Sequence, residues 1–259
     1  MKVSTLTLIG LLCLVLSNSE RVRGQGDEPS PKLVICGGGA LPNSVFDRFF
    51  ELAGPHPSLV VIPTASRREL DLDATEKLWR ARGFEQIHVL HTVDRQVAAT
   101  EEFVAPLQKA TAVWIGGGSQ QRIADAYLNT LVETELHALL QRGGVIGGSS
   151  AGAAIQSRVM IASGTSEPEI SVGFDLLRGS VVDQHFLRRN RIPRLIAAIE
   201  QHPTLIGFGL DEGTAIVLCN EKLEVVGKSY VVRIESAEGK LKVDAYNEGD
   251  KIPFQVSRD

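Results

Sequence analysis

The sequence predicts an α/β fold, a three-layer arrangement in which a mostly parallel sheet has helices on both faces. Short apolar runs bounded by Gly or Pro recur along the chain as far as Ile146, and segments with helical periodicity lie between them. Fully apolar strands that alternate with amphipathic helices are typical of a parallel sheet buried on both faces. After Ile206 the gaps shrink to the size of turns, which predicts an antiparallel extension at the C-terminal end.

The expected elements follow from these runs in chain order. The apolar runs predict strands at 32–36, 58–62, 87–90, 112–115 and 144–146. Apolar residues at helical spacing predict helices at 71–82, 100–110, 120–128 and 131–141, with a further helix from about 193 to 200. An apolar run at 206–210 and strands at 214–219, 222–226 and 230–234 complete the pattern.

The chain is expected to carry an N-terminal signal peptide, a short linker and one domain. Lys2 precedes an apolar run at 6–16, and small and polar residues follow, which is typical of a secretory signal at 1–24. The run is shorter than the roughly 20 residues that span a bilayer, so we expect no stable membrane insertion. Residues 25–31 are expected to form a linker, and 32–259 a single α/β domain. The protein is therefore expected to be secreted or periplasmic, with cleavage after Ser19 or Gly24 left open.

Composition excludes several classes of protein. Of the 259 residues, 43% are hydrophobic and 22% are charged, which is globular rather than disordered. The formal net charge is −4, and the basic residues form no footprint for a phosphate backbone, so nucleic acid is not an expected partner. Cys36 and Cys219 lie in apolar strand-like runs and are expected to be buried free thiols.

Two glycine-rich loops follow predicted strands, at 37–39 and 116–118. Neither fits a dinucleotide fingerprint, because Pro42 and Gln121 stand where the third glycine is needed. Such loops also allow the backbone to approach something bound at the carboxyl ends of strands. That function suits 116–118, whereas 37–39 could equally be a simple strand-to-helix turn.

The segment Gly148-Ser149-Ser150-Ala151-Gly152 follows a predicted strand and precedes a run of small residues. G-x-S-x-G in this context predicts a strained turn that lifts the central serine clear of the sheet. Ser150 is therefore the candidate nucleophile. The N–H of Ala151 is one candidate oxyanion donor, and Gly117 and Gly118 are candidates for the second.

A serine nucleophile needs a base and a carboxylate that orients it. Of six histidines, His185 is the best candidate, because it ends a short apolar run and precedes a basic stretch. Asp183 and Glu212 both compete as the orienting acid, and the residues alone do not choose between them. Arg189, Arg191 and Arg194 follow His185 closely. Their guanidinium groups bind carboxylates in pairs of hydrogen bonds, which indicates an acidic or carboxyl-terminated substrate.

These motifs resemble those of the cyanophycinase and dipeptidase E family of serine peptidases, whose fold is similar to that of class I glutamine amidotransferases. The resemblance rests on Gly116-Gly117-Gly118-Ser119-Gln120, the elbow around Ser150, Asp183-Gln184-His185-Phe186 with its three arginines, and Gly209-Leu210-Asp211-Glu212. The Asp-Gln-His-Phe string resembles the cyanophycinase branch most closely.

The resemblance implies that Ser150 is the nucleophile, His185 the general base and Glu212 the orienting acid. It also implies a substrate pocket formed by Gln120, Asp183, Gln184, Arg189, Arg191 and Arg194. The implied substrate is a peptide or a polyaspartate polymer that carries arginine side groups, cleaved to β-aspartyl-arginine through an acyl-enzyme. No metal or organic cofactor is implied.

Three alternatives are weighed beside this reading. An aspartyl dipeptidase would use the same chemistry on short peptides. A non-catalytic binding protein could retain the arginines to capture acidic peptides, but it would not need to retain all three of Ser150, His185 and Glu212. An α/β-hydrolase esterase needs its acid between serine and histidine, where Asp175 and Asp183 are available. The sequence leaves open whether the chain forms a homodimer.

Overall fold

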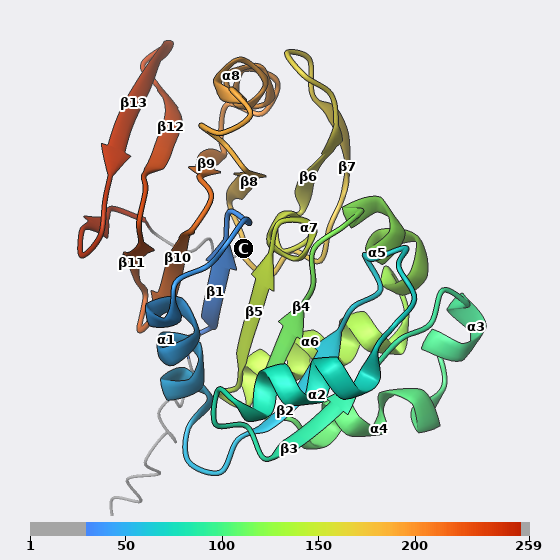
Figure 1. Cartoon of the computed structure of the whole chain (residues 1–259). Coiled ribbons are helices and arrows are strands. Elements are labelled where there is room, and N and C mark those ends of the chain that lie inside the picture. The colour runs from blue at the N-terminus through green and yellow to red at the C-terminus, as the bar shows by residue number, and fades with distance from the viewer. Residues whose placement is uncertain (1–29, 255–259) are drawn as a thin grey trace, which may run out of the picture.

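A computed structural model describes residues 30–254, and an eight-stranded sheet forms its centre (Figure 1). The strand order is β14-β11-β10-β1-β5-β4-β2-β3. The parallel strands are β1 (Lys32–Cys36), β5 (Val145–Ser149), β4 (Ala112–Ile115), β2 (Ser58–Ile62) and β3 (Gln86–Val89). All five expected parallel strands are present, so the predicted fold class is confirmed.

Helices cover both faces of this sheet, as the three-layer prediction requires. One face packs against α1 (Asn43–Ala53) and α2 (Leu72–Arg80), around an aromatic cluster that includes Phe49, Trp79 and Trp114. The other face packs against α4 (Glu101–Lys109), α5 (Gln120–Tyr127), α6 (Leu131–Gln141) and the short α7 (Ala151–Ala154), with α3 (Arg95–Ala98) beside α5. Side chains of Asp71, Thr100, Ser119 and Thr130 cap the helices that follow them.

The C-terminal strands divide between two sheets. Antiparallel strands β10 (Thr214–Cys219), β11 (Lys222–Gly227) and β14 (Lys251–Ile252) extend the main sheet as expected. In contrast, β12 (Val231–Ala237), which contains most of the strand predicted at 230–234, pairs with β9 (Ile206–Leu210). With β8 (Ser180–Gln184) and β13 (Lys240–Tyr246) these two strands form a second, four-stranded sheet. The apolar pattern indicates a strand, but it does not specify which neighbour the strand pairs with.

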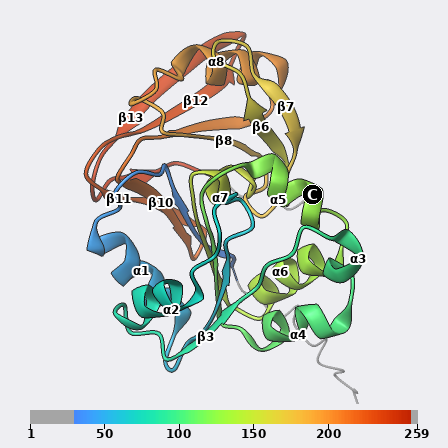
Figure 2. The same ribbon diagram turned by 45° about the vertical axis from the view of Figure 1, so that its right-hand side comes forward.

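The second sheet lies above the carboxyl ends of the main-sheet strands (Figure 2). Helix α8 (Ile192–Gln201) covers one of its faces, and Phe208 and Leu210 on the other face belong to the core of the main sheet. A hairpin of β6 (Val159–Ser163) and β7 (Glu169–Val172) stands beside it. The ends of β8 and β9 therefore meet the end of β5.

Cys36 and Cys219 are free thiols, as expected, although Cys219 is only partly buried. Complete burial raises the pKa of the Cys36 thiol well above its ordinary value. Within residues 30–254 no helix has the length and apolar character needed to cross a membrane. The predicted signal peptide at 1–24 and most of the linker at 25–31 lie outside the described residues.

Candidate active site

Ser150 occupies a sharp turn between β5 and α7, as the motif predicts. Its backbone has φ 56° and ψ −110°, an unusual conformation for a residue with a side chain, and its N–H donates to Cys36 O at 3.0 Å. The two motif glycines permit this turn. A Cβ at Gly148 would lie 2.1 Å from Gly152 O, and one at Gly152 would lie 2.1 Å from Ile115 O.

His185 immediately follows β8 and also has a left-handed backbone, with φ 51°. Its N–H donates to Gly37 O at 2.7 Å, which ties it to the loop after β1. The ring Nε2 lies 2.9 Å from Ser150 Oγ, and the ring Nδ1 lies 2.7 Å from Glu212 Oε1. With a carboxylate at Nδ1, we assign the proton to that nitrogen, which leaves Nε2 to accept the hydrogen bond from the serine hydroxyl.

The geometry distinguishes Glu212 from Asp183, the two carboxylates that the sequence left in competition. Asp183 is fully buried and accepts from Arg194 Nε at 2.7 Å and Nη2 at 2.5 Å, while Arg191 Nη1 lies 3.4 Å away. Asp183 is inside β8, whereas His185 lies beyond its end in a left-handed conformation. Spacing of two residues therefore does not place them on one face, and Glu212 alone of the two contacts the imidazole.

The environment of His185 favours its neutral form. Burial lowers the pKa of the imidazole most, the hydrogen bond and charge of Glu212 oppose this, and Arg189 and Arg191 add to the lowering. The net direction is below the ordinary value. A neutral imidazole at neutral pH can accept the proton of Ser150.

The loop at 116–118 lies beside Ser150. A Cβ at Gly117 would be 3.4 Å from Ser150 Cβ and 4.0 Å from its Oγ. Gly118 has φ 143° and packs on Ala65, whose carbonyl accepts the Ser119 N–H at 3.0 Å. The N–H groups of Gly117, Gly118 and Ala151 donate to no partner within the part of the chain that the structure describes. They are free to receive an oxyanion.

The loop at 37–39 supports the other side of the site, a function that the sequence left undecided. A Cβ at Gly38 would lie 2.4 Å from His185 Cε1, and one at Gly39 would lie 2.8 Å from Glu212 Cβ. Both glycines have positive φ. The only sequence signal for this contact is the run of three glycines at the end of a strand, which does not reveal what packs against it.

The other expected pocket residues differ in what they contact. Gln120 is buried, and its Nε2 donates to the carbonyls of Ile161 and Ala162 at 2.8 and 2.9 Å. Arg194, already paired with Asp183, also donates to Gly164 O at 2.6 Å and is 2% exposed.

Gln184, Arg191 and Arg189 have more of their groups available. The Oε1 of Gln184 is buried and has no partner within residues 30–254. Arg191 Nη1 donates to Gln184 O at 2.6 Å. Arg189 is exposed, and its guanidinium has no hydrogen-bond partner among the described residues. Of the three arginines, Arg189 is thus the freest to meet a ligand.

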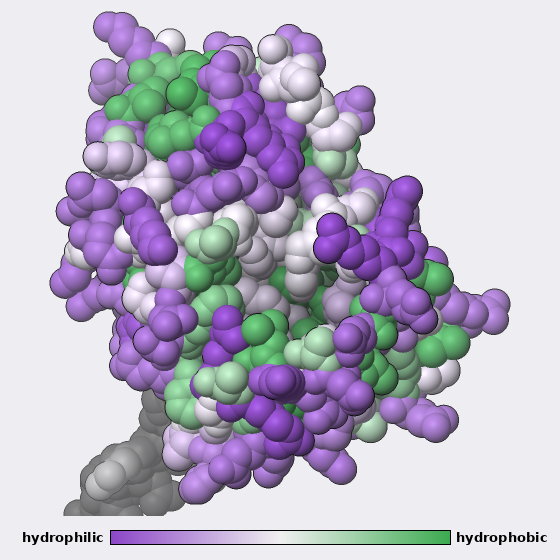
Figure 3. Space-filling view, in the orientation of Figure 1, coloured by the Kyte–Doolittle hydropathy of each residue, from purple (hydrophilic) through white to green (hydrophobic). Residues whose placement is uncertain are grey.

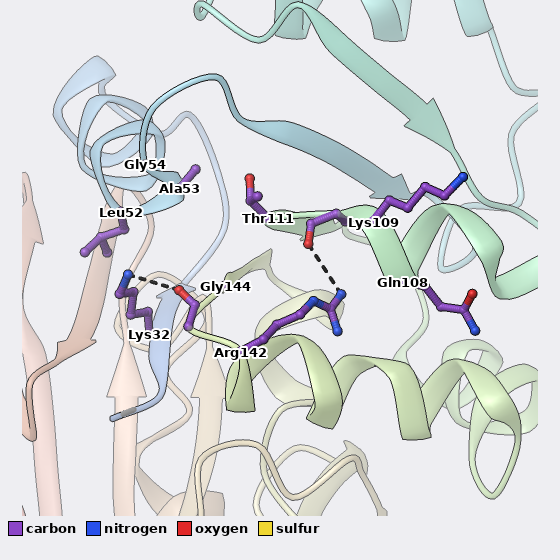
Figure 4. Close-up of a pocket in the computed structure, with 11 residues that line it drawn as sticks. Lys32, Leu52, Ala53, Gly54, Gln108, Lys109, Thr111, Arg142 and Gly144 are labelled. Atoms are coloured by element: carbon purple, nitrogen blue, oxygen red, sulfur yellow. Dashed lines mark hydrogen bonds between the residues drawn. The ribbon is translucent and has the colours of Figure 1, made fainter. Parts of the chain in front are cut away.

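The shape of the surface agrees with a site at the carboxyl ends of the central strands. The face in Figure 3 is hollowed near its centre, over the carboxyl ends of β1 and β5, and pale to apolar residues line the hollow between strongly hydrophilic side chains. A separate pocket, shown in Figure 4, lies at the opposite ends of the strands. There Lys32 Nζ donates to Gly143 O at 3.0 Å and Arg142 Nη2 to Ala110 O at 3.4 Å, so these cations satisfy carbonyls. Within residues 30–254 no group of three or more His, Cys, Asp or Glu could hold a metal ion.

Comparison with known proteins identifies the family. The model of peptidase family S51 matches residues 33–226. Cyanophycinase from Geminocystis herdmanii is 31% identical over 202 residues, which cover 74% of each chain. Cyanophycinase from Synechococcus elongatus is 34% identical over 221 residues, covering 78% of this chain and 68% of that protein.

A solved structure shows the same architecture. The crystal structure of a peptidase from an acI-B1 Actinobacterium superposes with a TM-score of 0.72 at 25% identity, covering 88% of this chain and 98% of the other. The chain therefore belongs to peptidase family S51, and it is a serine-type hydrolase that resembles the cyanophycinases.

Proposed function

We propose that Ser150, His185 and Glu212 form the catalytic triad of a secreted peptidase of the cyanophycinase type. The observation that carries this proposal is the continuous chain of hydrogen bonds from Ser150 Oγ through both imidazole nitrogens to Glu212, at 2.9 and 2.7 Å. A nucleophile, a base and an orienting acid at these distances constitute the arrangement that serine acyl transfer requires.

In the acylation step, Ser150 Oγ attacks the carbonyl carbon of the scissile amide and its proton passes to His185 Nε2. The carbonyl π electrons move to oxygen, and the free N–H groups beside Ser150 stabilise that oxyanion. The C–N bond then breaks, and His185 returns the proton to the departing amine. Glu212 holds the ring in the correct tautomer and stabilises the imidazolium while it exists.

Deacylation repeats these steps with water. His185 Nε2 takes a proton from a water molecule, whose oxygen attacks the acyl carbon. When the C–O bond to Ser150 breaks, the proton returns to Oγ, so the serine is restored and a carboxylic acid product is released. No cofactor enters either step.

The substrate we propose is a polyaspartate-type polymer or an aspartyl peptide, with arginine attached to aspartyl side chains. Support comes from the cyanophycinase relatives and from the exposed Arg189 guanidinium beside His185, which can meet a substrate carboxylate. The unpartnered Oε1 of Gln184 can accept a hydrogen bond from a substrate N–H or guanidinium. Asp183 and Arg194 form an ion pair with each other. In this proposal they support the structure beneath the site and do not bind substrate.

The test is incubation of the purified chain with insoluble multi-arginyl-polyaspartate, with mass spectrometry of the soluble products. We expect release of β-aspartyl-arginine, and no release from Ser150→Ala at equal concentration. Cleavage of short Asp-X peptides without release from the polymer would assign an aspartyl dipeptidase instead. No cleavage and no labelling of Ser150 by a fluorophosphonate would contradict a serine hydrolase and favour a binding protein.

Secretion is part of the proposal because the apolar run at 6–16 has the character of a signal peptide. Expression of the full chain followed by N-terminal sequencing of exported protein tests it. We expect a mature chain that begins at residue 20 or residue 25. A chain retained in the cytoplasm with residue 2 intact would contradict export.

A further inference from the structure

Asp211 is a carboxylate that the proposed mechanism does not use, although it directly precedes Glu212. It follows the last residue of β9 and is partly buried. Its Oδ1 accepts the Arg188 N–H at 2.9 Å, and its Oδ2 accepts the Ser229 hydroxyl at 2.7 Å. Backbone N–H groups of Leu187 and Glu212 also act on it. Each of these groups is a hydrogen-bond donor.

These donors come from three separate segments around the site. Leu187 and Arg188 belong to the loop that leaves His185, Glu212 belongs to the link between the two sheets, and Ser229 belongs to the turn after β11. Ser229 is itself fixed, because its N–H donates to Thr214 Oγ1 at 2.8 Å. The Asp211 side chain therefore joins the loop after His185 to the segment that contains Glu212.

The backbone of His185 needs such support. A left-handed conformation at a residue with a side chain is strained and persists only where the surroundings enforce it. The His185 N–H is held by Gly37 O at 2.7 Å and the Phe186 N–H by Leu210 O at 3.1 Å. Asp211 accepts the Arg188 N–H, so His185, Phe186 and Arg188 are all tied to the ends of β1 and β9.

The carboxylate is ionised in this environment. Burial opposes ionisation, but hydrogen bonds from Ser229, Arg188, Glu212 and Leu187 outweigh it and lower the pKa of Asp211 below its ordinary value. An amide in its place would direct an NH₂ group at one of these donors. Asp211→Asn therefore loosens the connection without changing the size of the side chain.

We infer that Asp211 is a positioning residue, which fixes the loop after His185 against the segment of Glu212 and so sets the geometry of the imidazole–carboxylate pair. Its carboxylate makes no hydrogen bond to the side chains of Ser150, His185 or Glu212. The inference rests on the proposed function only for its effect on turnover, because the alignment of His185 with Glu212 can be measured without substrate.

The test compares Asp211→Asn, Ser229→Ala and the wild-type chain by two readouts. One is kcat and KM, measured with the substrate that the wild-type chain cleaves in the assay described above. The other is the pKa of His185, followed by NMR of its Cε1 proton and assigned with His185→Ala. Asp47→Asn is the control, since Asp47 is exposed on α1 and the substitution removes the same charge. Ser229→Ala changes no charge, so it separates positioning from electrostatics.

We expect Asp211→Asn to lower kcat about tenfold or more with KM nearly unchanged, because misplacement of a catalytic group acts on the transition state. Since Glu212 raises the pKa of His185, a looser pair should lower that pKa. Ser229→Ala should move both quantities in the same direction by less, and Asp47→Asn should move neither.

Three outcomes decide the inference. An Asp211→Asn variant with unchanged kcat and unchanged His185 pKa, even one that melts earlier, would overturn it and leave a stabilising contact. A raised KM with unchanged kcat and pKa would also overturn it, because Asp211 would then act on the substrate loop. If the wild-type chain cleaves nothing, while the His185 pKa still depends on Asp211 and Ser229, the proposed function fails and the positioning inference stands.

Discussion

The candidate triad is built from two regions that obey different rules. Ser150 follows a central strand of the main sheet, in a strand–turn–helix segment whose geometry is local. His185 follows β8 of the second sheet, and Glu212 lies between β9 of the second sheet and β10 of the main sheet. The candidate nucleophile is thus specified by five consecutive residues, whereas the positions of the candidate base and acid depend on how the two sheets meet.

This difference shows where glycine acts in the site. In the elbow, Gly148 and Gly152 allow close approach within one segment and to the neighbouring strand β4. In the loop at 37–39, Gly38 and Gly39 leave room for side chains that lie more than 140 residues later in the chain. The first requirement can be read from a motif, while the second appears only when the sheets are assembled.

The largest expected loss of kcat comes from a substitution in the local region, at Ser150. Ser150→Ala should lower kcat by about 10³-fold or more while substrate still binds, because the nucleophile is removed and the pocket is retained. The measurement is steady-state turnover, together with substrate affinity by calorimetry. Ser149→Ala is the matched control and should stay within a few-fold of wild type. Turnover near wild type in Ser150→Ala would contradict the assignment of the nucleophile.

The next largest loss of kcat is expected at Glu212, the candidate acid, whose position depends on how the two sheets meet. Glu212→Gln should lower kcat by about 10²–10⁴-fold, because the amide no longer stabilises the imidazolium and can favour the wrong tautomer. The fold should survive, since Glu212 is only partly buried.

Asp183→Asn provides the comparison that the sequence leaves open. Asp183 is fully buried between Arg194 and Arg191, so its neutralisation should cost about 3–5 kcal/mol of unfolding free energy. Thermal melting and kcat of both variants separate the two acids. A stable Asp183→Asn variant with the larger loss of kcat would reverse their functions.

The contrast between these regions also explains how far the sequence alone could lead. Strands at 32–36, 58–62 and 112–115 are predicted to the residue because parallel strands buried on both faces are apolar throughout and end at Gly or Pro. The elbow at Ser150 is predicted for the same reason, since all its determinants are adjacent.

What escapes prediction is set by long-range assembly. The strand predicted at 230–234 has the same apolar pattern whether it pairs with β11 or with β9. The pattern therefore does not predict the second sheet. Likewise, Asp183 and Glu212 are both carboxylates near strand ends. Only the left-handed turn at His185 directs its ring away from Asp183 and toward Glu212.

A smaller loss of kcat is expected at Gly38, where the loop after β1 packs against His185. Gly38→Ala places a Cβ 2.4 Å from His185 Cε1 at a backbone φ of 102°, so the ring must move away from Ser150. We expect kcat to fall by about 10–100-fold, because a displacement of 1 Å can cost about 10²-fold. Steady-state kinetics and the rate of fluorophosphonate labelling measure it.

Gly239→Ala separates the contact from backbone strain. Gly239 also has positive φ, at 74°, but nothing lies within 4 Å of an added Cβ. It should lose some stability and keep its kcat. Equal losses of kcat in both variants would show that strain, and not contact with His185, is responsible.

The smallest expected effect is a change in the pKa of His185 caused by removing the charge of Arg189. Arg189 lowers the pKa of His185, so Arg189→Ala should raise that pKa toward its ordinary value. Activity requires the neutral imidazole, hence the acid limb of the kcat/KM profile should move to higher pH. The shift should shrink as salt is added, since an exposed charge is screened. Arg188→Ala removes the same charge from the same loop, but Arg189 and not Arg188 is among the leading influences on the pKa of His185, so the profile of this variant should shift less. Equal shifts in the two variants would mean that the general field of the loop, and not the position of Arg189, tunes the base.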